Sequence, residues 1–210
     1  MNNKAKYLII YFILIFILYI STIHTYIQFY DIDRIGIKEF KEFYLSNQKM
    51  FFNNTYIFTI YLYINRTEYL SPIIAVRFNK IYNTNFIYNI ILNSMFVTLF
   101  LFVTCFLTSF ILNLTVDVKT LLYFIYLFLF FIKINSFYFL SYVLTSNHVV
   151  SLFLVILEST IILITYLCLG FIGIDLSDII KIFVSPIYCL VVSIVITILS
   201  IRIANRKDCI

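Results

Sequence analysis

Charged side chains are scarce in this sequence. Only 12% of its 210 residues are Asp, Glu, Lys or Arg, whereas 63% are hydrophobic; soluble domains are about 25% charged and 45–50% apolar. So few charges cannot cover a globule in water, which excludes a soluble enzyme, a disordered chain and a disulfide-stapled secreted module. We therefore expect an all-α, multi-pass integral protein of the cell membrane, with residues 1–210 forming a single transmembrane domain.

Small residues are also rare. The chain contains 3 glycines and no tryptophan, but 24 Phe and 18 Tyr. Membrane helices commonly approach each other through Gly and Ala, so the helices here must interlock bulky Ile, Leu and Phe, with Ser, Thr and Asn adding hydrogen bonds. The same bias favours residues with A/T-rich codons, which indicates a low-GC genome such as that of many Gram-positive bacteria.

Catalytic and nucleotide-binding signatures are missing. No G-x-x-x-x-G-K-[ST] phosphate loop occurs, the two histidines (His24 and His148) stand at the ends of different apolar segments, and the four cysteines show no C-x-x-C spacing. A nucleophilic or metal mechanism needs a base or a ligand set. We expect no enzyme activity, cofactor or metal in this chain, and its few scattered basic residues predict no nucleic-acid binding.

About 20 apolar residues cross a bilayer as a helix, and six segments are candidates. Five reach this length, whereas Met50–Ile64 is shorter and contains Asn53 and Asn54. The six candidate spans are Tyr7–Ile27, Met50–Ile64, Phe86–Leu112, Leu121–Val143, Val149–Ile174 and Phe183–Ile201.

The distribution of charge favours six spans with both termini in the cytoplasm. In that arrangement, the side with the termini and the Asn65–Asn85 loop carries eight basic and two acidic residues, against six basic and seven acidic on the other side. Basic residues next to span ends stay inside. A five-span arrangement would place either the Arg202–Lys207 cluster or the Lys4/Lys6 pair outside.

A basic amphipathic helix is expected over Ser71–Tyr82, directly before the third span. Ser71 and Pro72 form a favourable helix start, and the apolar side chains fall on one side of the helix, opposite Arg77 and Lys80. Such a helix lies at the inner membrane surface. It either anchors the loop to anionic lipid or docks a cytoplasmic partner, and the sequence leaves both alternatives open.

The order of these parts resembles a known family. A signal-anchor span, an outer loop, a second span and the inner segment IIAVRFNKIYNTNFIYN before a long apolar span are similar to small permease subunits of ABC-2-type transporters of Gram-positive bacteria, including those of bacteriocin and antimicrobial-peptide export or immunity systems. The resemblance implies a homodimer or heterodimer of permease subunits in the lipid bilayer, driven by a separate ATP-binding subunit. The implied partner-coupling residues are Arg77, Phe78, Lys80 and Tyr82.

The alternative function is a non-transporting immunity or accessory protein. Its bulky apolar faces would bind a hydrophobic peptide or another membrane subunit.

Two charges lie inside the expected spans, where they are costly and usually have a purpose. Lys133 precedes the tight turn near Leu144–His148 by about 11 residues, and Glu158 follows it by about 10, so both lie roughly 15 Å deep. We therefore predict a buried Lys133–Glu158 pair, aided by Asn135, Ser136 and Ser159. It would be a stabilising clasp, a polar patch facing a translocation path or a dimer seam, or a proton-coupling site.

Two further segments near the outer face carry expectations. Ser185-Pro186 repeats the helix-start pattern, so the last span either begins at Pro186 or is a longer helix with a kink there. Ile35–Leu45 has apolar residues at three-to-four spacing, and it is expected to lie on the outer surface.

Overall fold

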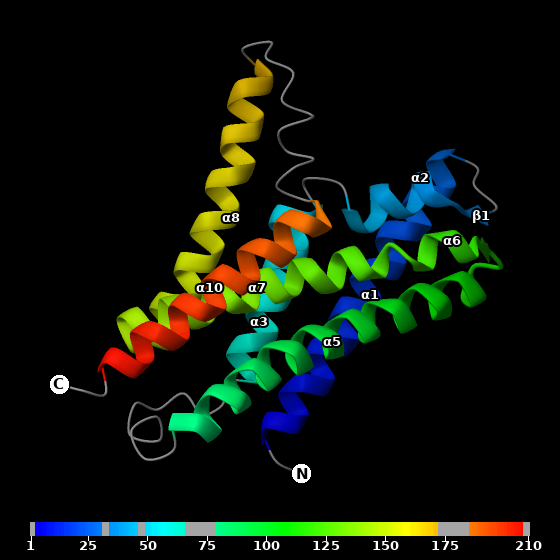
Figure 1. The fold of residues 1–210 in the computed structure, drawn as a ribbon. Coiled ribbons are helices and arrows are strands. Elements are labelled where there is room, and N and C mark those ends of the chain that lie inside the picture. The colour runs from blue at the N-terminus through cyan, green and yellow to red at the C-terminus, as the bar shows by residue number, and fades with distance from the viewer. Residues whose placement is uncertain (1–2, 31–33, 46–48, 66–78, 172–184, 208–210) are drawn as a thin grey trace.

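Long apolar helices dominate the computed structural model, which describes residues 3–30, 34–45, 49–65, 79–171 and 185–207 (Figure 1). Five of its helices are long and apolar enough to cross a membrane. They are α1 (Asn3–Tyr30), α5 (Asn79–Ile111), α7 (Phe124–Thr145), α8 (His148–Phe171) and α10 (Pro186–Lys207). The all-α class is confirmed, and these helices suit a multi-pass membrane protein.

The short apolar segment Met50–Ile64 is broken into two pieces. A π-helical turn, η2 (Lys49–Asn54), leads directly into α3 (Thr55–Ile64). At 1.5 Å per residue, the ten residues of α3 reach about 15 Å, half of the roughly 30 Å hydrocarbon core. The side chains of Thr55, Phe58 and Thr59 are buried. This half-length helix therefore packs one face into the bundle, while Ile60 and Tyr63 on its other face are about half exposed.

Side-chain contacts fix the relative directions of the helices. Helices α5 and α7 are antiparallel, because contacts join Ile90 to Asn135, Phe86 to Phe139 and Phe102 to Phe124. Helices α7 and α10 are parallel, because contacts join Ser136 to Thr197 and Val143 to Ala204. Helix α3 is antiparallel to both α1 and α5, according to the contacts of Tyr11 with Ile57, Tyr19 with Asn54, Tyr61 with Phe96 and Asn65 with Asn93.

The last long helix begins at the proline that the sequence marks as a helix start. Ser185 precedes α10, and its Oγ accepts a hydrogen bond from the Tyr188 backbone N–H at 3.2 Å. This bond satisfies one of the N–H groups that a helix start leaves unpaired. The prediction of a helix start at Pro186 is confirmed; the preceding residues 172–184 lie outside the described part of the chain.

The expectation that Ile35–Leu45 lies on the surface is wrong. This segment contains β1 (Arg34–Ile35), α2 (Ile37–Phe40) and the π-helical turn η1 (Lys41–Leu45), and β1 pairs in parallel with β2 (Thr115–Val116), which precedes the short α6 (Val118–Leu121). Phe40, Phe43 and Tyr44 are buried. Three aromatic rings within five residues supply more apolar area than a surface loop would bury, so they fill the end of the bundle between α1 and α7.

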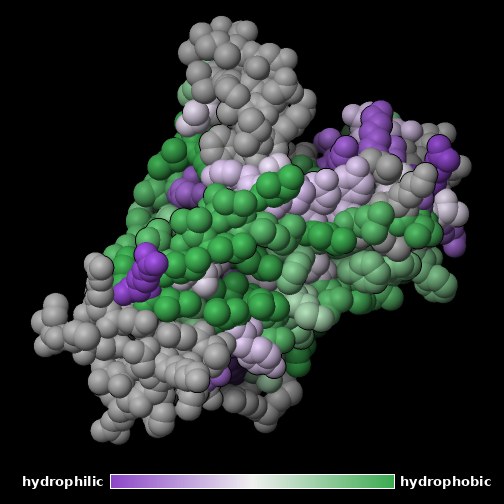
Figure 2. All heavy atoms as spheres, in the orientation of Figure 1, coloured by the Kyte–Doolittle hydropathy of each residue, from purple (hydrophilic) through white to green (hydrophobic). Residues whose placement is uncertain are grey.

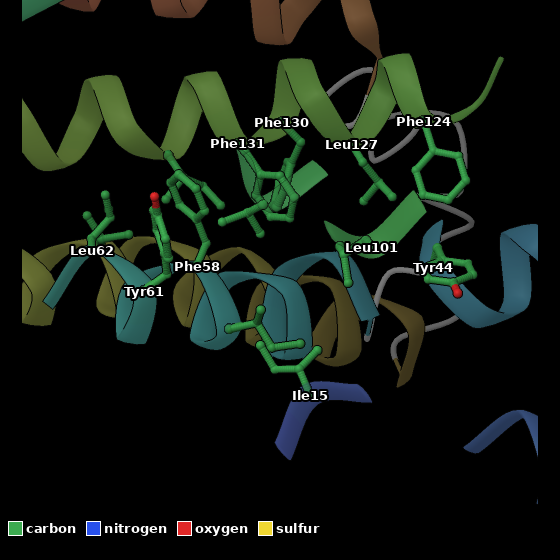
Figure 3. Close-up of a cluster of buried hydrophobic side chains, with 14 of the residues drawn as sticks. Ile15, Tyr44, Phe58, Tyr61, Leu62, Leu101, Phe124, Leu127, Phe130 and Phe131 are labelled. Carbon is green, nitrogen blue, oxygen red and sulfur yellow. The ribbon is translucent and has the colours of Figure 1, made fainter. Parts of the chain in front are cut away.

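Bulky side chains fill the core, as the scarcity of glycine predicts. Figure 3 shows Phe58 and Tyr61 of α3 facing Phe130 and Phe131 of α7. The rings of Phe58 and Phe131 stack with centroids 4.8 Å apart. Buried Thr and Ser side chains of α5, namely Thr98, Thr108 and Ser109, hydrogen-bond to backbone carbonyls of their own helix.

The outer surface is apolar over its middle. Hydrophobic side chains cover the centre of the face seen in Figure 2, whereas hydrophilic ones gather toward the ends, above all near α2. Large hydrophobic side chains on every long helix are more than 40% exposed. Contiguous apolar surface of this extent marks contact with a membrane or with other proteins.

Candidate functional site

The two charges predicted to meet are in contact. Lys133 Nζ of α7 lies 2.7 Å from Glu158 Oε1 of α8, so the two side chains form an ion pair. The Lys133 side chain is only 3% exposed and that of Glu158 26%. Lys133 is near the middle of α7, and Glu158 is near the middle of α8. The pair therefore joins two antiparallel helices about halfway along their lengths.

A tight turn sets this register. Helix α7 ends at Thr145, and Ser146 adopts a left-handed conformation with φ of 54°. Asn147 Oδ1 accepts a hydrogen bond from the Val149 backbone N–H at 2.9 Å, which caps the start of α8. Only two residues separate the helices. Because Lys133 and Glu158 are similar numbers of residues away from this turn, the two charges lie at the same level.

Hydrogen bonds extend the ion pair toward α3. Ser159 Oγ donates to Glu158 Oε2 at 3.3 Å, and Thr55 Oγ1 donates to Ser159 Oγ at 3.3 Å. Ser159 therefore supports the pair as expected from the sequence. Asn135 and Ser136 do not: Asn135 donates to the Ile90 carbonyl of α5, and Ser136 accepts from Thr197 of α10. These two side chains connect α7 to its other neighbours.

The polar contacts continue on the far side of α3. Asn54, at the junction of η2 and α3, donates to the Tyr44 carbonyl at 2.8 Å and accepts from the Tyr19 hydroxyl at 2.7 Å. Asn54 and Thr55 are adjacent and both fully buried. A polar network thus crosses the bundle from α1 through η2 and α3 to α8 and α7. In the sequence, the one sign of this role is that Asn54 interrupts the apolar segment Met50–Ile64.

The pair joins a buried lysine to a half-buried glutamate, and each charge depends on the other for its stability. Removing a charge from water costs several kcal/mol per ion, and good geometry with further hydrogen bonds is needed to offset this. The 2.7 Å contact and the bond from Ser159 provide both for Glu158. The site can hold α3, α7 and α8 together. Alternatively, Lys133 or Glu158 can exchange its partner for a charged group that enters the bundle.

The expected partner-coupling residues fall at the edge of the described chain. Arg77 and Phe78 lie outside it, whereas Lys80 and Tyr82 belong to the first turns of α5. Helix α5 runs without a break from Asn79 to Ile111, and its apolar membrane-length part begins at Asn85. Its first six residues extend the helix by about 9 Å beyond that part. The end of the expected basic helix is therefore rigidly continuous with a membrane-length helix.

Among the residues that the structure describes, histidine and cysteine do not gather into a site. His148 Nδ1 is 2.6 Å from the Tyr138 hydroxyl, and its ring stacks on Tyr142 with centroids 4.2 Å apart, so it packs the α7–α8 turn. His24 lies on α1. Within the described ranges, no group of three His, Cys, Asp or Glu residues is placed to hold a metal ion.

Comparison with known proteins finds no counterpart: no family model, curated protein or solved structure matches the chain.

Proposed function

We propose that this chain is the membrane-spanning permease subunit of an ATP-driven, ABC-2-type exporter in the cell membrane. It crosses the bilayer six times with both termini in the cytoplasm, and the segment η2–α3 makes the second crossing. It acts as a dimer of permease subunits, with ATP hydrolysed by a separate chain.

The alternating directions of the helices support six crossings. Helices α1, α5 and α8 point one way, and α3, α7 and α10 point the other way, as the contacts between them require. With the excess of basic residues beside the two termini, the positive-inside rule then favours cytoplasmic ends.

The continuity of α5 is the observation that carries the exporter proposal. A docking element transmits force only if it is stiff up to the membrane. Asn79–Ile111 is one helix, so a displacement of Lys80 or Tyr82 moves the membrane-length part with it. The same helix contacts the central α7 at both ends, through Phe86 and Phe102. A displacement of residues 79–82 is therefore transmitted to the core of the bundle.

Copurification with a partner tests the proposal. The chain, purified from its native membrane in mild detergent, is expected to retain a phosphate-loop ATPase. The double variant Arg77→Glu/Lys80→Glu should recover at least about ten times less ATPase, because it replaces two cations at the docking face by anions. The matched control Arg206→Glu/Lys207→Glu changes the same charges at the other end of the chain and should leave recovery unchanged.

Two results contradict this account. If the ATPase stays bound to the Arg77→Glu/Lys80→Glu variant with unchanged activity, this helix is not the docking element. If the wild-type chain retains no ATPase, the exporter proposal fails, and the immunity or accessory function is favoured. The broad apolar surface of α1, where Ile13, Leu14 and Ile17 are at least half exposed, would then be the binding face for a hydrophobic peptide or another membrane subunit.

A further inference from the structure

An apolar groove of about 850 Å³ lies between α1 and α3. Its floor consists of Tyr11, Ile15 and Ile57, which are less than 9% exposed, and its rim includes Leu14 and Ile60, which are 62% and 49% exposed. The Tyr11 hydroxyl donates to the Ile57 carbonyl. This bond turns the polar end of the ring toward the backbone and joins the two helices beneath the groove, so the floor is a hydrocarbon surface.

The length of the groove matches one leaflet of a bilayer. It follows α1 from Lys4 to Leu18, and these 14 steps span about 21 Å. The hydrocarbon core is about 30 Å thick, so one leaflet contributes about 15 Å, with its headgroups beyond. A partner helix that crosses the membrane would need a longer surface, whereas an acyl chain with its headgroup fits this length.

The groove is closed at the end that lies away from Lys4, deep in the membrane. Beyond Leu18, the inward side of α1 is covered by the turn η1: the ring of Tyr19 stacks on Tyr44 with centroids 5.0 Å apart, and Tyr26 packs against Phe43 at 4.9 Å. The short α3 starts at the same level, where Asn54 bonds to Tyr19. Because α3 is half-length, the groove opens toward only one membrane surface.

A cation stands at the open end. Of the described residues that line the groove, Lys4 is charged and the others are uncharged. Lys6 follows two positions later in the sequence. A lysine at this depth keeps its ammonium group at the headgroup level while its stem lies along apolar surface. The cytoplasmic leaflet is the anionic one, and it attracts basic residues near its surface.

We propose that this groove is a binding site for one anionic phospholipid, with an acyl chain along Tyr11, Ile15 and Ile57 and the phosphate near Lys4. The site requires insertion of the chain in a membrane but no ATPase partner. The lipid completes the surface where α3 is too short to cover α1.

The absence of tryptophan allows a direct test with single-tryptophan reporters. Tyr7→Trp places the reporter on a groove-lining residue that is 60% exposed. Tyr88→Trp is the matched control: Tyr88 is 61% exposed, does not line this groove, and lies three residues into the apolar part of α5, as Tyr7 does in α1. The full chain is reconstituted into phosphatidylcholine vesicles that contain an equal, minor fraction of brominated phosphatidylglycerol or brominated phosphatidylcholine.

Quenching at position 7 should show about a five-fold local preference for phosphatidylglycerol, the size expected for one lysine near an anionic surface. Quenching at position 88 should show no comparable preference. Adding Lys4→Glu to the Tyr7→Trp chain should abolish the preference, and Lys4→Arg should keep it.

Equal quenching at position 7 by both lipids overturns the proposal, because the groove then selects no headgroup. Weaker quenching at position 7 than at position 88 by both lipids also overturns it, because a second copy of the chain or a hydrophobic peptide then covers the groove. Neither result bears on ATPase binding, so the exporter proposal is tested separately.

Discussion

Helices α7 and α8 share one ion pair but have opposite surroundings. In the apolar part of α7, 61% of the residues are buried within the protein, against 22% in α8. Figure 1 shows α7 between its neighbours α5 and α10, whereas α8 leaves the bundle at a steep angle. Lys133 is on the buried helix and Glu158 on the peripheral one. Packing therefore holds α7 in place, and α8 depends more on a small number of polar contacts.

Because of this difference, the two charges have different surroundings when the ion pair is broken. An unpaired ammonium on α7 has no access to water or headgroups, because the Lys133 side chain is 3% exposed. The Glu158 side chain is 26% exposed, and its carboxylate keeps a hydrogen bond from Ser159. The pair is best understood as a clasp that attaches α8 and, through Ser159 and Thr55, the half-length α3.

Charge reversal should have the largest effect. Lys133→Glu and Glu158→Lys each place like charges side by side within the bundle, and each should lower stability by about 3–5 kcal/mol or more, a large part of a typical folding free energy. Folded yield, measured by size-exclusion chromatography in detergent, should collapse for either single variant and recover in the double swap. Lys38→Glu, an exposed residue on α2, is the control for charge alone. Absence of recovery in the double swap would mean that the two residues do not meet.

Removal of an aromatic ring should have the next largest effect, and the effect should be larger on α7 than on α8. Phe131 of α7 is fully buried and stacks on Phe58, whereas Phe153 of α8 is 61% exposed. Phe131→Ala should destabilise the protein by about 3–5 kcal/mol through loss of packing and the cavity left behind. Phe153→Ala should change stability by less than about 0.5 kcal/mol. Thermal unfolding in detergent measures both, and equal losses would show that α8 is packed as tightly as α7.

The smallest effect is expected at the link between α3 and α8. Thr55→Val removes the hydroxyl that donates to Ser159, at a cost of about 0.6 kcal/mol, the average for hydrogen bonds between membrane helices. Thr160→Val is the control, because the Thr160 hydroxyl bonds only within its own helix, to the Ile156 carbonyl. The same unfolding measurement should rank Thr55→Val below Thr160→Val in stability. The reverse order of stability would show that the Thr55 hydroxyl does not link α3 to the polar network around Glu158.

Sequence alone predicted the contact of Lys133 with Glu158 because two local facts determine it: each charge interrupts an apolar run, and a turn of fixed length lies between them. At Ser185-Pro186 the sequence left a helix start and a kinked longer helix open, and the structure shows the start of α10 at Pro186. The burial of Phe40, Phe43 and Tyr44 was not predictable, since their spacing suits a surface helix equally well. Only the space between α1 and α7, a tertiary feature, decides where these rings go.

The hydrogen-bond partners of Asn54 could not be predicted from the sequence either. Its partners, Tyr19 and the Tyr44 carbonyl, come from segments 35 and 10 residues away, and the π-helical turn that aims its side chain has no sequence pattern of its own. The break of Met50–Ile64 into η2 and α3 is a consequence of tertiary packing around this amide.

Cysteine accessibility on either side of α3 tests the central claim most directly. On a background without the four native cysteines, Asn47→Cys and Asn79→Cys are treated in intact cells with a membrane-impermeant maleimide. The proposed topology predicts labelling at position 47 in intact cells and labelling at position 79 only after the membrane is permeabilised. Labelling of position 79 in intact cells would place the start of α5 outside, where no ATPase can reach it, and would contradict the exporter account.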